Sequence, residues 1–397
     1  MLTADQALAS AGYRLRLSQP GASVEDVADA LVGLHTTSPV SPYLSLRARV
    51  PSFVRSDLDA LMWGSWDLVR FRAMRNTMFV LSRQLLEEAA QATHHVSEAY
   101  AGRWLRDSGL TARQFDRLAD AIDGALADRP LTVRALRAVL DVPKTVDVAG
   151  IVSRLCDVGR LVGGAPPRSW RSSIRQYHRW VDVLPDVDLH RYGQVTAIRK
   201  LIQRYVGAYG PVTMSDIAWW TGFTKGQCTA ALDALGSGIE EVSVADWPGP
   251  LYRIAGDDPP ASPASGVRAL PLLDPYVQGY RDRVRLVEPE RHGYVYDGGG
   301  NASATLVGGG RIFGVWQPSD EPEESVRYHL FGRQPRTVRR AVEADLAAAG
   351  AMYFDRSVDV IEVADMQPLS AGGGRSAMHP LDDRIHRAAR RQRGRNG

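Results

Sequence analysis

Apolar residues in the first quarter of the chain recur with the period of a helix. Behind Ser23, a residue type that caps helix N-termini, they follow at spacings of three or four from Val24 onwards, which predicts a helix ending near His35. Ser56 is a second cap, and the pattern behind it predicts a short helix through about Gly64. The chain is therefore expected to begin with helices.

The period changes to two immediately afterwards. In residues 69–73 apolar side chains alternate with Arg70 and Arg72, and a second β-prone run follows at 77–81. Residues 74–76 are the expected turn between two strands. Helices followed by a basic hairpin are the order of a winged-helix domain.

The same order returns more clearly in residues 210–254. One capped helix reaches Trp220, Thr224 opens a second helix, and strands at 239–244 and 251–254 flank a turn rich in proline and glycine. A weaker copy lies between these two. Its three helices and two strands are expected at residues 111–127, 133–140, 148–158, 160–163 and 177–184.

The connection between the two strands of this middle copy, residues 163–180, interleaves arginine with aromatic residues. Guanidinium groups contact phosphate, and aromatic faces contact sugars or bases, so Trp170, Arg171, Arg175 and Tyr177 are predicted to contact DNA. A solvated loop is the alternative. The two other wing patterns in the chain favour the contact with DNA.

The last third of the chain changes to short strands. A linker rich in Pro, Ala and Ser at 257–266 is followed by β-prone runs at 293–297, 302–308, 310–317 and 325–332, then a helix at 337–349 and a strand at 358–363. Glycine triplets separate some of the runs. They are not phosphate loops, because a strand follows each triplet and no Lys-Ser/Thr pair is present.

Composition excludes several classes of protein. With 397 residues, 44% of them hydrophobic and 23% charged, the chain is expected to form several compact units. No apolar run approaches the ~18 residues that span a bilayer, and the N-terminus lacks a basic flank with an apolar core, which predicts a cytoplasmic, nucleoid-associated protein. Two cysteines and scattered histidines predict no disulfide framework, no metal and no cofactor.

Positive charge is concentrated at the C-terminus. Residues 369–397 carry a net charge of +5, which leaves −2 for the rest of the chain. This segment is expected to be flexible, or transiently helical near 382–392. It adds either nonspecific affinity for a polyanion or solubility.

Three stretches of the sequence resemble a known family. They are GLHTTSPVSPYLSLRARV with LVRFRAMRNTMFVLSR (33–50 and 68–83), YVGAYGPVTMSDIAWWTGFT (205–224) and LPLLDPYVQGYRDR (270–283). Their sequence resembles bacterial winged-helix DNA-binding proteins, a family that includes the AlkZ and YcaQ DNA glycosylases. The resemblance implies an α+β fold with tandem winged-helix domains, three in number, and a small β-barrel-like C-terminal domain. The expected boundaries are 1–90, 91–188, 189–258 and 264–368, followed by the basic tail at 369–397.

The resemblance also singles out one triplet. In the glycosylase members two working side chains form Gln-x-Gln or Gln-x-Asp, and His35-Thr36-Thr37 stands at that place. An alkylated purine is cationic and leaves readily, so its hydrolysis needs a positioned water rather than a strong acid. Residues separated by one position on an extended segment face the same side, which predicts that His35 and Thr37 both face the DNA.

His35 and Thr37 are thus the candidate catalytic residues, with the imidazole accepting a proton from water that the hydroxyl orients. In the structural alternative, His35 stabilises a helix C-terminus and the threonines satisfy backbone groups of a turn.

Two functions from different classes follow from the resemblance. The first is a monofunctional DNA glycosylase that hydrolyses the N-glycosidic bond of alkylated purines in double-stranded DNA, alkylated or crosslinked; the second is a non-catalytic, regulatory winged-helix DNA-binding protein. Either is expected to act as a monomer, away from membranes. The residues expected to contact DNA are Ser38, Arg47, Arg70, Arg72, Arg75, Asn76, Trp170, Arg171, Arg175, Tyr177, Tyr280, Arg281 and Arg283.

Overall fold

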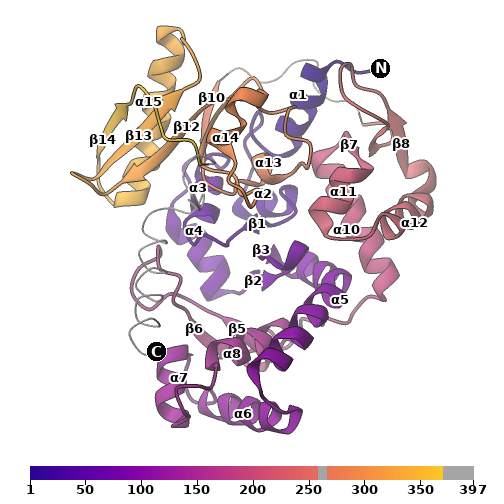
Figure 1. The fold of residues 1–397 in the computed structure, drawn as a ribbon, viewed down its shortest axis with the longest axis vertical. Coiled ribbons are helices and arrows are strands. Elements are labelled where there is room, and N and C mark those ends of the chain that lie inside the picture. The colour runs from indigo at the N-terminus through magenta and orange to yellow at the C-terminus, as the bar shows by residue number, and fades with distance from the viewer. Residues whose placement is uncertain (258–265, 370–397) are drawn as a thin grey trace. The chain divides into compact units, whose positions relative to one another are not determined.

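Helices and strands alternate along the whole chain in a mixed α+β fold, seen in a computed structural model that describes residues 1–257 and 266–369 (Figure 1). The predicted linker is described only at its ends, and the predicted basic tail, including the helix expected near 382–392, lies outside the described residues from 370 on. No helix within the described ranges is both long and apolar enough to span a membrane.

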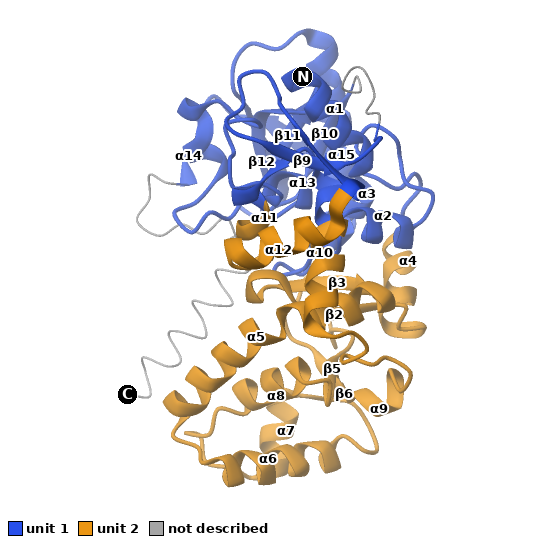
Figure 2. Ribbon diagram, turned by 90° about the vertical axis from the view of Figure 1, so that its right-hand side faces the viewer, with its two compact units in different colours: residues 1–53, 205–216, 237–397 blue, residues 54–204, 217–236 orange. Residues whose placement is uncertain are grey.

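The described chain divides into two compact units (Figure 2). Unit 1 comprises residues 1–53, 205–216 and 237–397, and unit 2 comprises 54–204 and 217–236. Helices α10 (Gln194–Tyr209) and α11 (Met214–Thr221) contain points where the chain passes between the units. This division groups the chain differently from the five predicted segments, whose boundaries stay predictions.

Unit 1 begins with two capped helices, α1 (Ala4–Arg14) and α2 (Val24–Ala30), then β1 (Leu34–His35) and α3 (Ser41–Arg47). Ser23 caps α2 as predicted, accepting a hydrogen bond from the Asp26 N–H. The predicted helix end near His35 is wrong. The Gly33 N–H bonds to the Ala28 carbonyl and the Val32 N–H to the Asp29 carbonyl, a closure that ends the helix before His35.

The C-terminal part of unit 1 is built on a five-stranded sheet of order β10-β11-β12-β13-β14. Its strands are β10 (Val267–Leu270), β11 (Thr305–Gly308), β12 (Arg311–Ser319), β13 (Ser325–Leu330) and β14 (Asp359–Glu362). The first four are antiparallel, and β14 joins β13 in parallel after helix α15 (Arg336–Phe354). The sheet is open among the described residues, with β10 and β14 at its edges, so the closed, barrel-like arrangement expected here is not formed.

The last predicted helix and strand are confirmed as α15 and β14, but the β-prone run at 293–297 is wrong. It contains most of the short helix α14 (His292–Val295), in which the Tyr296 N–H bonds to the His292 carbonyl. Short apolar runs do not distinguish a strand from a helical turn by periodicity alone. Helix α13 (Pro275–Gln278) and the 3-10 turn Pro289–Arg291 complete this region.

A fully buried ion pair connects α3 to the segment before α13. Arg49 donates to both carboxylate oxygens of Asp274 over 2.7 and 2.8 Å, and its Nε donates to the Leu15 carbonyl. The Ser45 hydroxyl donates to the same carboxylate over 2.6 Å. This network is the polar centre of unit 1, because both charged side chains are wholly shielded from water.

Unit 2 opens with α4 (Arg55–Asp59), a π-helical turn (Ala60–Gly64) and the hairpin β2 (Leu68–Arg72) and β3 (Met78–Ser82). The register pairs Val69 with Leu81 and Phe71 with Phe79, and Met74–Asn76 is the turn, as the alternation predicts. Helix α5 (Arg83–Ser108) follows without a break in the chain, a long helix that periodicity did not single out.

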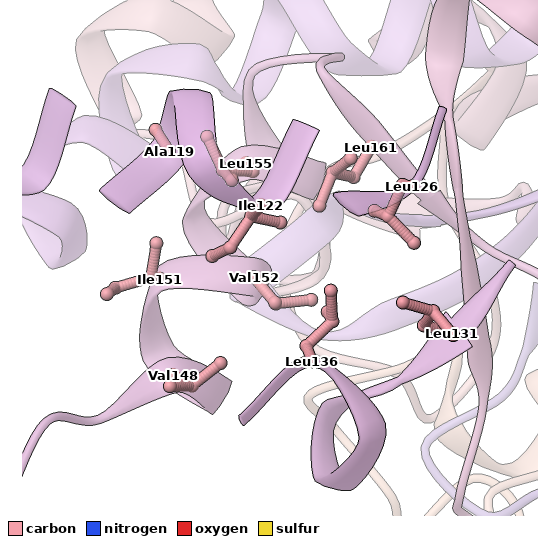
Figure 3. Packing of buried hydrophobic residues seen from close by; sticks show 10 residues of the cluster. All are labelled: Ala119, Ile122, Leu126, Leu131, Leu136, Val148, Ile151, Val152, Leu155 and Leu161. Atoms are coloured by element: carbon pink, nitrogen blue, oxygen red, sulfur yellow. The ribbon is translucent and has the colours of Figure 1, made fainter. Parts of the chain in front are cut away.

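The middle of unit 2 packs helices against a small sheet of order β4-β6-β5. Its elements are α6 (Ala112–Ala125), β4 (Leu131–Thr132), α7 (Val133–Leu140), α8 (Val148–Asp157), β5 (Leu161–Gly163), β6 (Gln176–Arg179) and α9 (Trp180–Val183). The three predicted helices are confirmed, and Thr111 and Thr132 cap the first two. Figure 3 shows the apolar side chains of these elements meeting in one buried cluster. The strand predicted through 184 is wrong beyond Arg179, because the Leu184 N–H bonds to the Trp180 carbonyl.

The third-quarter pattern is confirmed in its elements. Helix α11 and α12 (Lys225–Leu235) are followed by β8 (Ile239–Val242) and β9 (Leu251–Ile254). A two-residue strand, β7 (Val212–Thr213), precedes α11, and unit 1 contains the sheet β7-β9-β8. Thr224 begins α12 with a reciprocal capping box to Gln227.

Candidate active site

The His35-Thr36-Thr37 triplet follows directly from the two-residue strand β1. His35 is 6% exposed and Thr36 is 3% exposed, whereas Thr37 lies at a bend with its side chain exposed. The expectation that positions 35 and 37 would present both side chains on one side is therefore not met. The bend ends the extended backbone on which that expectation depended.

The imidazole of His35 contacts the backbone that carries Thr37. The Thr37 N–H donates to His35 Nδ1 over 3.5 Å, a long hydrogen bond. A nitrogen that accepts a hydrogen bond carries no proton, so this contact favours the neutral tautomer protonated at Nε2. His35 is thereby suited to fix the position of Thr37, and Thr37 is the member of the triplet that reaches solvent.

A strained turn precedes the triplet. Val32 has φ 53° and Gly33 has φ 97°, and the left-handed region is unfavourable for a β-branched side chain such as that of Val32. The buried Tyr209 hydroxyl donates to the Leu31 carbonyl over 2.9 Å. Tyr209 thus stabilises the turn from α10, at the residue before the strained positions.

The segment after the triplet is held from the 270–283 stretch. The Ser41 hydroxyl donates to the Leu272 carbonyl over 2.8 Å, and Ser45 and Arg49 bind Asp274. Three of the stretches that resemble the family therefore contact one another within unit 1. Sequence reasoning did not assign roles to Tyr209, Arg49 or Asp274, although all three lie inside those stretches.

The candidate DNA contacts of unit 1 differ in accessibility. Ser38 and Tyr280 are buried, and the Tyr280 hydroxyl donates to the Tyr209 carbonyl over 3.1 Å. Arg47 forms a two-pronged ion pair with Asp345, with both distances 3.0 Å. Of these residues, none presents an uncommitted side chain to a polyanion in this conformation.

Arg281 and Arg283 also differ from each other. Arg281 is exposed, and its backbone N–H donates to Asp216. Arg283 lies 3.9 Å from the ring centroid of Tyr296 and donates to the Gly300 carbonyl over 2.7 Å, while burial lowers its pKa. The position of Arg281 suits a phosphate contact, and Arg283 binds its own loop.

The hairpin of unit 2 carries four further candidates. Arg72 binds Asp157 and Ser153, and its third hydrogen bond goes to the Asn76 carbonyl. Arg75, which has φ 52°, lies over the Trp219 ring at 4.0 Å. The Arg70 guanidinium makes no hydrogen bond or ion pair with any residue that the structure describes.

The arginine- and aromatic-rich loop is more ordered than a solvated loop would be. Arg175 is 7% exposed and donates to the carbonyls of Ser172 and Ile174. The Arg55 guanidinium lies 4.9 Å from the centroid of Trp170, and Arg171 is half-buried. Burial raises the pKa of Tyr177, which therefore remains neutral. Arg175 stabilises the loop itself, so its predicted contact with DNA requires the loop to change conformation.

Comparisons with known proteins cover most of the chain. A family model described as "DNA glycosylase AlkZ-like" matches residues 28–352. An "Interstrand DNA cross-link repair glycosylase" of Streptomyces sahachiroi is 26% identical over 324 residues, 77% of this chain and 84% of the relative. The solved structure of the Streptomyces sahachiroi DNA glycosylase AlkZ aligns with a TM-score of 0.72 at 23% identity, over 91% of this chain and 100% of that one.

Proposed function

The chain belongs to the AlkZ-like DNA glycosylases, and from that premise we propose that it hydrolyses the N-glycosidic bond of alkylated purines in duplex DNA. The observation that supports the proposal is the position of Thr37. Its exposed side chain stands in the triplet where the glycosylase members have their second working residue, on a turn that buried contacts hold.

The chemistry needs little from the protein. The C1′–N bond of the cationic nucleotide breaks with its electron pair passing to the base, which leaves neutral, and a water oxygen bonds to C1′ and loses its proton to solvent. The Thr37 hydroxyl orients this water, and His35 fixes Thr37 through its backbone. Because Nδ1 accepts that bond, His35 acts as a positioning residue in this proposal rather than as the base.

The finer organisation is also proposed. The sheets β4-β6-β5 and β7-β9-β8 have the same topology, in which a short strand before the helices pairs with the second strand of the following hairpin. This topology supports winged-helix domains at 91–188 and 189–258, and the basic hairpin at 68–82 supports a third at 1–90. The name of the Streptomyces relative extends the proposed substrates to crosslinked duplex DNA.

The proposal is tested by measuring the free base released from a duplex that contains N7-methylguanine, against a control without enzyme. Wild type should release base, and the double variant His35→Gln/Thr37→Gln, which restores the family's Gln-x-Gln, should release it faster. The unfolding midpoints of the two proteins serve as the control for folding. If both give only the background yield, the proposed hydrolysis is wrong.

A non-catalytic DNA-binding protein is the second candidate, and the burial of His35 favours it. It predicts duplex binding that weakens as salt rises, without base release. Anisotropy of a labelled duplex between 50 and 200 mM salt separates the two candidates from a third outcome, no affinity, which would exclude both.

A further inference from the structure

A second site lies in unit 2, outside the triplet. A cavity of about 220 Å³ is enclosed by β2, β3, α8, β5 and the segment around β6, elements that Figure 2 draws in one unit. Its polar lining comes from Arg70, Arg72, Ser153, Asp157, Ser173 and Tyr177. The space exceeds that of several water molecules, which need ~10–15 Å³ each on this measure.

One positive charge in this lining has no counterpart. Arg72 and Asp157 neutralise each other over 3.0 Å. Arg70 forms no ion pair within the described part of the chain, and its Nε is buried without a hydrogen-bond partner. Burial raises the pKa of the neighbouring Cys156 thiol to about 12 and also raises that of Tyr177, so neither supplies a negative charge near pH 7.

A guanidinium stays charged at any physiological pH, and partial burial without an anion costs free energy. Burial lowers the pKa of Arg70, in agreement with that cost. An anionic ligand in the cavity would remove the cost, since a charged group that binds an anion in a shielded site forms its strongest hydrogen bonds there.

Two hydroxyl groups are placed to complete an anion site. The Ser153 oxygen accepts from Arg72 over 2.9 Å, which leaves its own hydrogen available as a donor. The Tyr177 hydroxyl makes no hydrogen bond to another described residue, and it lines the same cavity. Three donors of this kind match the oxygens of a phosphate group.

The remaining walls are apolar. Phe71, Met78, Leu161 and the buried ring of Trp180 contact the cavity beside its polar side. A site that combines one guanidinium, hydroxyl donors and aromatic walls suits a phosphate group attached to a sugar and a planar base. Inorganic phosphate would leave the apolar walls unused.

We propose that this cavity binds the phosphate ester of a nucleotide, with Arg70 neutralising the phosphate and Tyr177 and Ser153 donating hydrogen bonds to it. The nucleotide belongs either to a DNA strand or to a free nucleoside monophosphate, since both present the same group. The proposal does not depend on base release at the triplet.

Calorimetric titration of the full-length protein tests the site. The probes are deoxyguanosine monophosphate, deoxyguanosine, inorganic phosphate and a short duplex. Arg70→Gln should weaken binding of the phosphorylated probe at least tenfold, and Tyr177→Phe should weaken it about threefold. Arg160→Gln is the matched control, because it removes the same charge from an exposed pair with Asp120 in the same unit, and it should change binding less than twofold.

The probes distinguish the sources of the phosphate. Loss of monophosphate binding in Arg70→Gln identifies a free-nucleotide site, and loss confined to the duplex identifies a contact with the DNA backbone. Deoxyguanosine should bind at least tenfold more weakly than its monophosphate. If Arg70→Gln and Arg160→Gln change neither affinity, or change both equally, the proposal is overturned.

Thermal unfolding gives a readout that a failed fold cannot imitate. Without ligand, Arg70→Gln should raise the melting temperature by about 2–4 °C, because it removes an uncompensated charge. The monophosphate should then stabilise wild type and not the variant. A variant that melts well below wild type would contradict the claim that the Arg70 charge is uncompensated.

Discussion

Thr37 is the member of the His35-Thr36-Thr37 triplet whose side chain reaches solvent. Its neighbours are buried, and His35 contacts it through the backbone. At the scale of single residues, the proposed reaction therefore depends on one hydroxyl group.

Replacing Thr37 by valine keeps the shape of the side chain and removes the hydroxyl. Base release from the N7-methylguanine duplex should fall by about 10- to 100-fold, since orientation of a reacting group contributes on that scale. Thr37→Ser, which retains the hydroxyl, should stay within about threefold of wild type. Equal rates for valine and serine would show that the hydroxyl takes no part.

Cys228 links single-residue chemistry to stability. Burial raises the pKa of its thiol to about 11, so between the ordinary value of 9.0 and about 11 only the unfolded chain ionises it. A group whose folded pKa is raised contributes stability below its unfolded pKa and loses it as pH rises.

The free energy of unfolding should therefore fall more steeply above pH 9 in wild type than in Cys228→Ala, with a difference of roughly 1 kcal/mol in the pH-dependent part at pH 10. Urea denaturation at pH 8 and pH 10 measures it. The buried tyrosines titrate with the same sign in both proteins, so the difference isolates the thiol. Parallel pH profiles would contradict the raised pKa.

At the scale of elements, the turn before β1 determines where the triplet lies. Val32 occupies the left-handed position that usually takes glycine, and Gly33 follows it. The Tyr209 hydroxyl stabilises this turn through the Leu31 carbonyl.

Tyr209→Phe should lower stability by about 1–2 kcal/mol, because the buried Leu31 carbonyl loses its partner, and should also slow base release. Tyr205→Phe is the control: its hydroxyl donates to the Gly279 carbonyl over 2.7 Å, and its ring stacks on Tyr209. It should lose similar stability at unchanged base release. Equal slowing in both variants would exclude a specific role for the turn.

The Arg49–Asp274 pair connects elements that are distant in sequence. Asp274→Asn would leave the Arg49 charge in a fully shielded position and should destabilise the fold by about 3–5 kcal/mol, measured by urea denaturation. Asp120→Asn, in an exposed pair with Arg160, should cost far less. A small effect at Asp274 would mean that water reaches the pair.

At the scale of the whole molecule, charge is distributed unevenly. The last 29 residues carry +5, and the rest of the chain carries −2. A chain ending at Leu369 should bind duplex DNA more weakly and with a salt dependence reduced by about 1–4 in the slope of log K against log salt, measured by anisotropy. An unchanged slope would assign the segment to solubility instead.

The sequence alone determined most of the elements. Capping residues and periodicity are local signals, so the hairpin at 68–82, the helices of the middle copy and the strands β8 and β9 were predictable. The end of α2 was not, because a valine rarely takes the left-handed position and nothing local marks that it does so here.

Which predicted contacts are accessible was decided only by tertiary structure. Arg47, Arg72 and Arg70 have the same side chain and similar local sequence, yet Asp345 and Asp157 neutralise the first two, and Arg70 lines a cavity without a carboxylate partner among the described residues. The family triplet is likewise visible in the sequence, but the burial of His35 and the exposure of Thr37 are not. Periodicity reports the face of one element, whereas ion pairing and burial depend on residues brought from elsewhere in the chain, and only the folded structure specifies those partners.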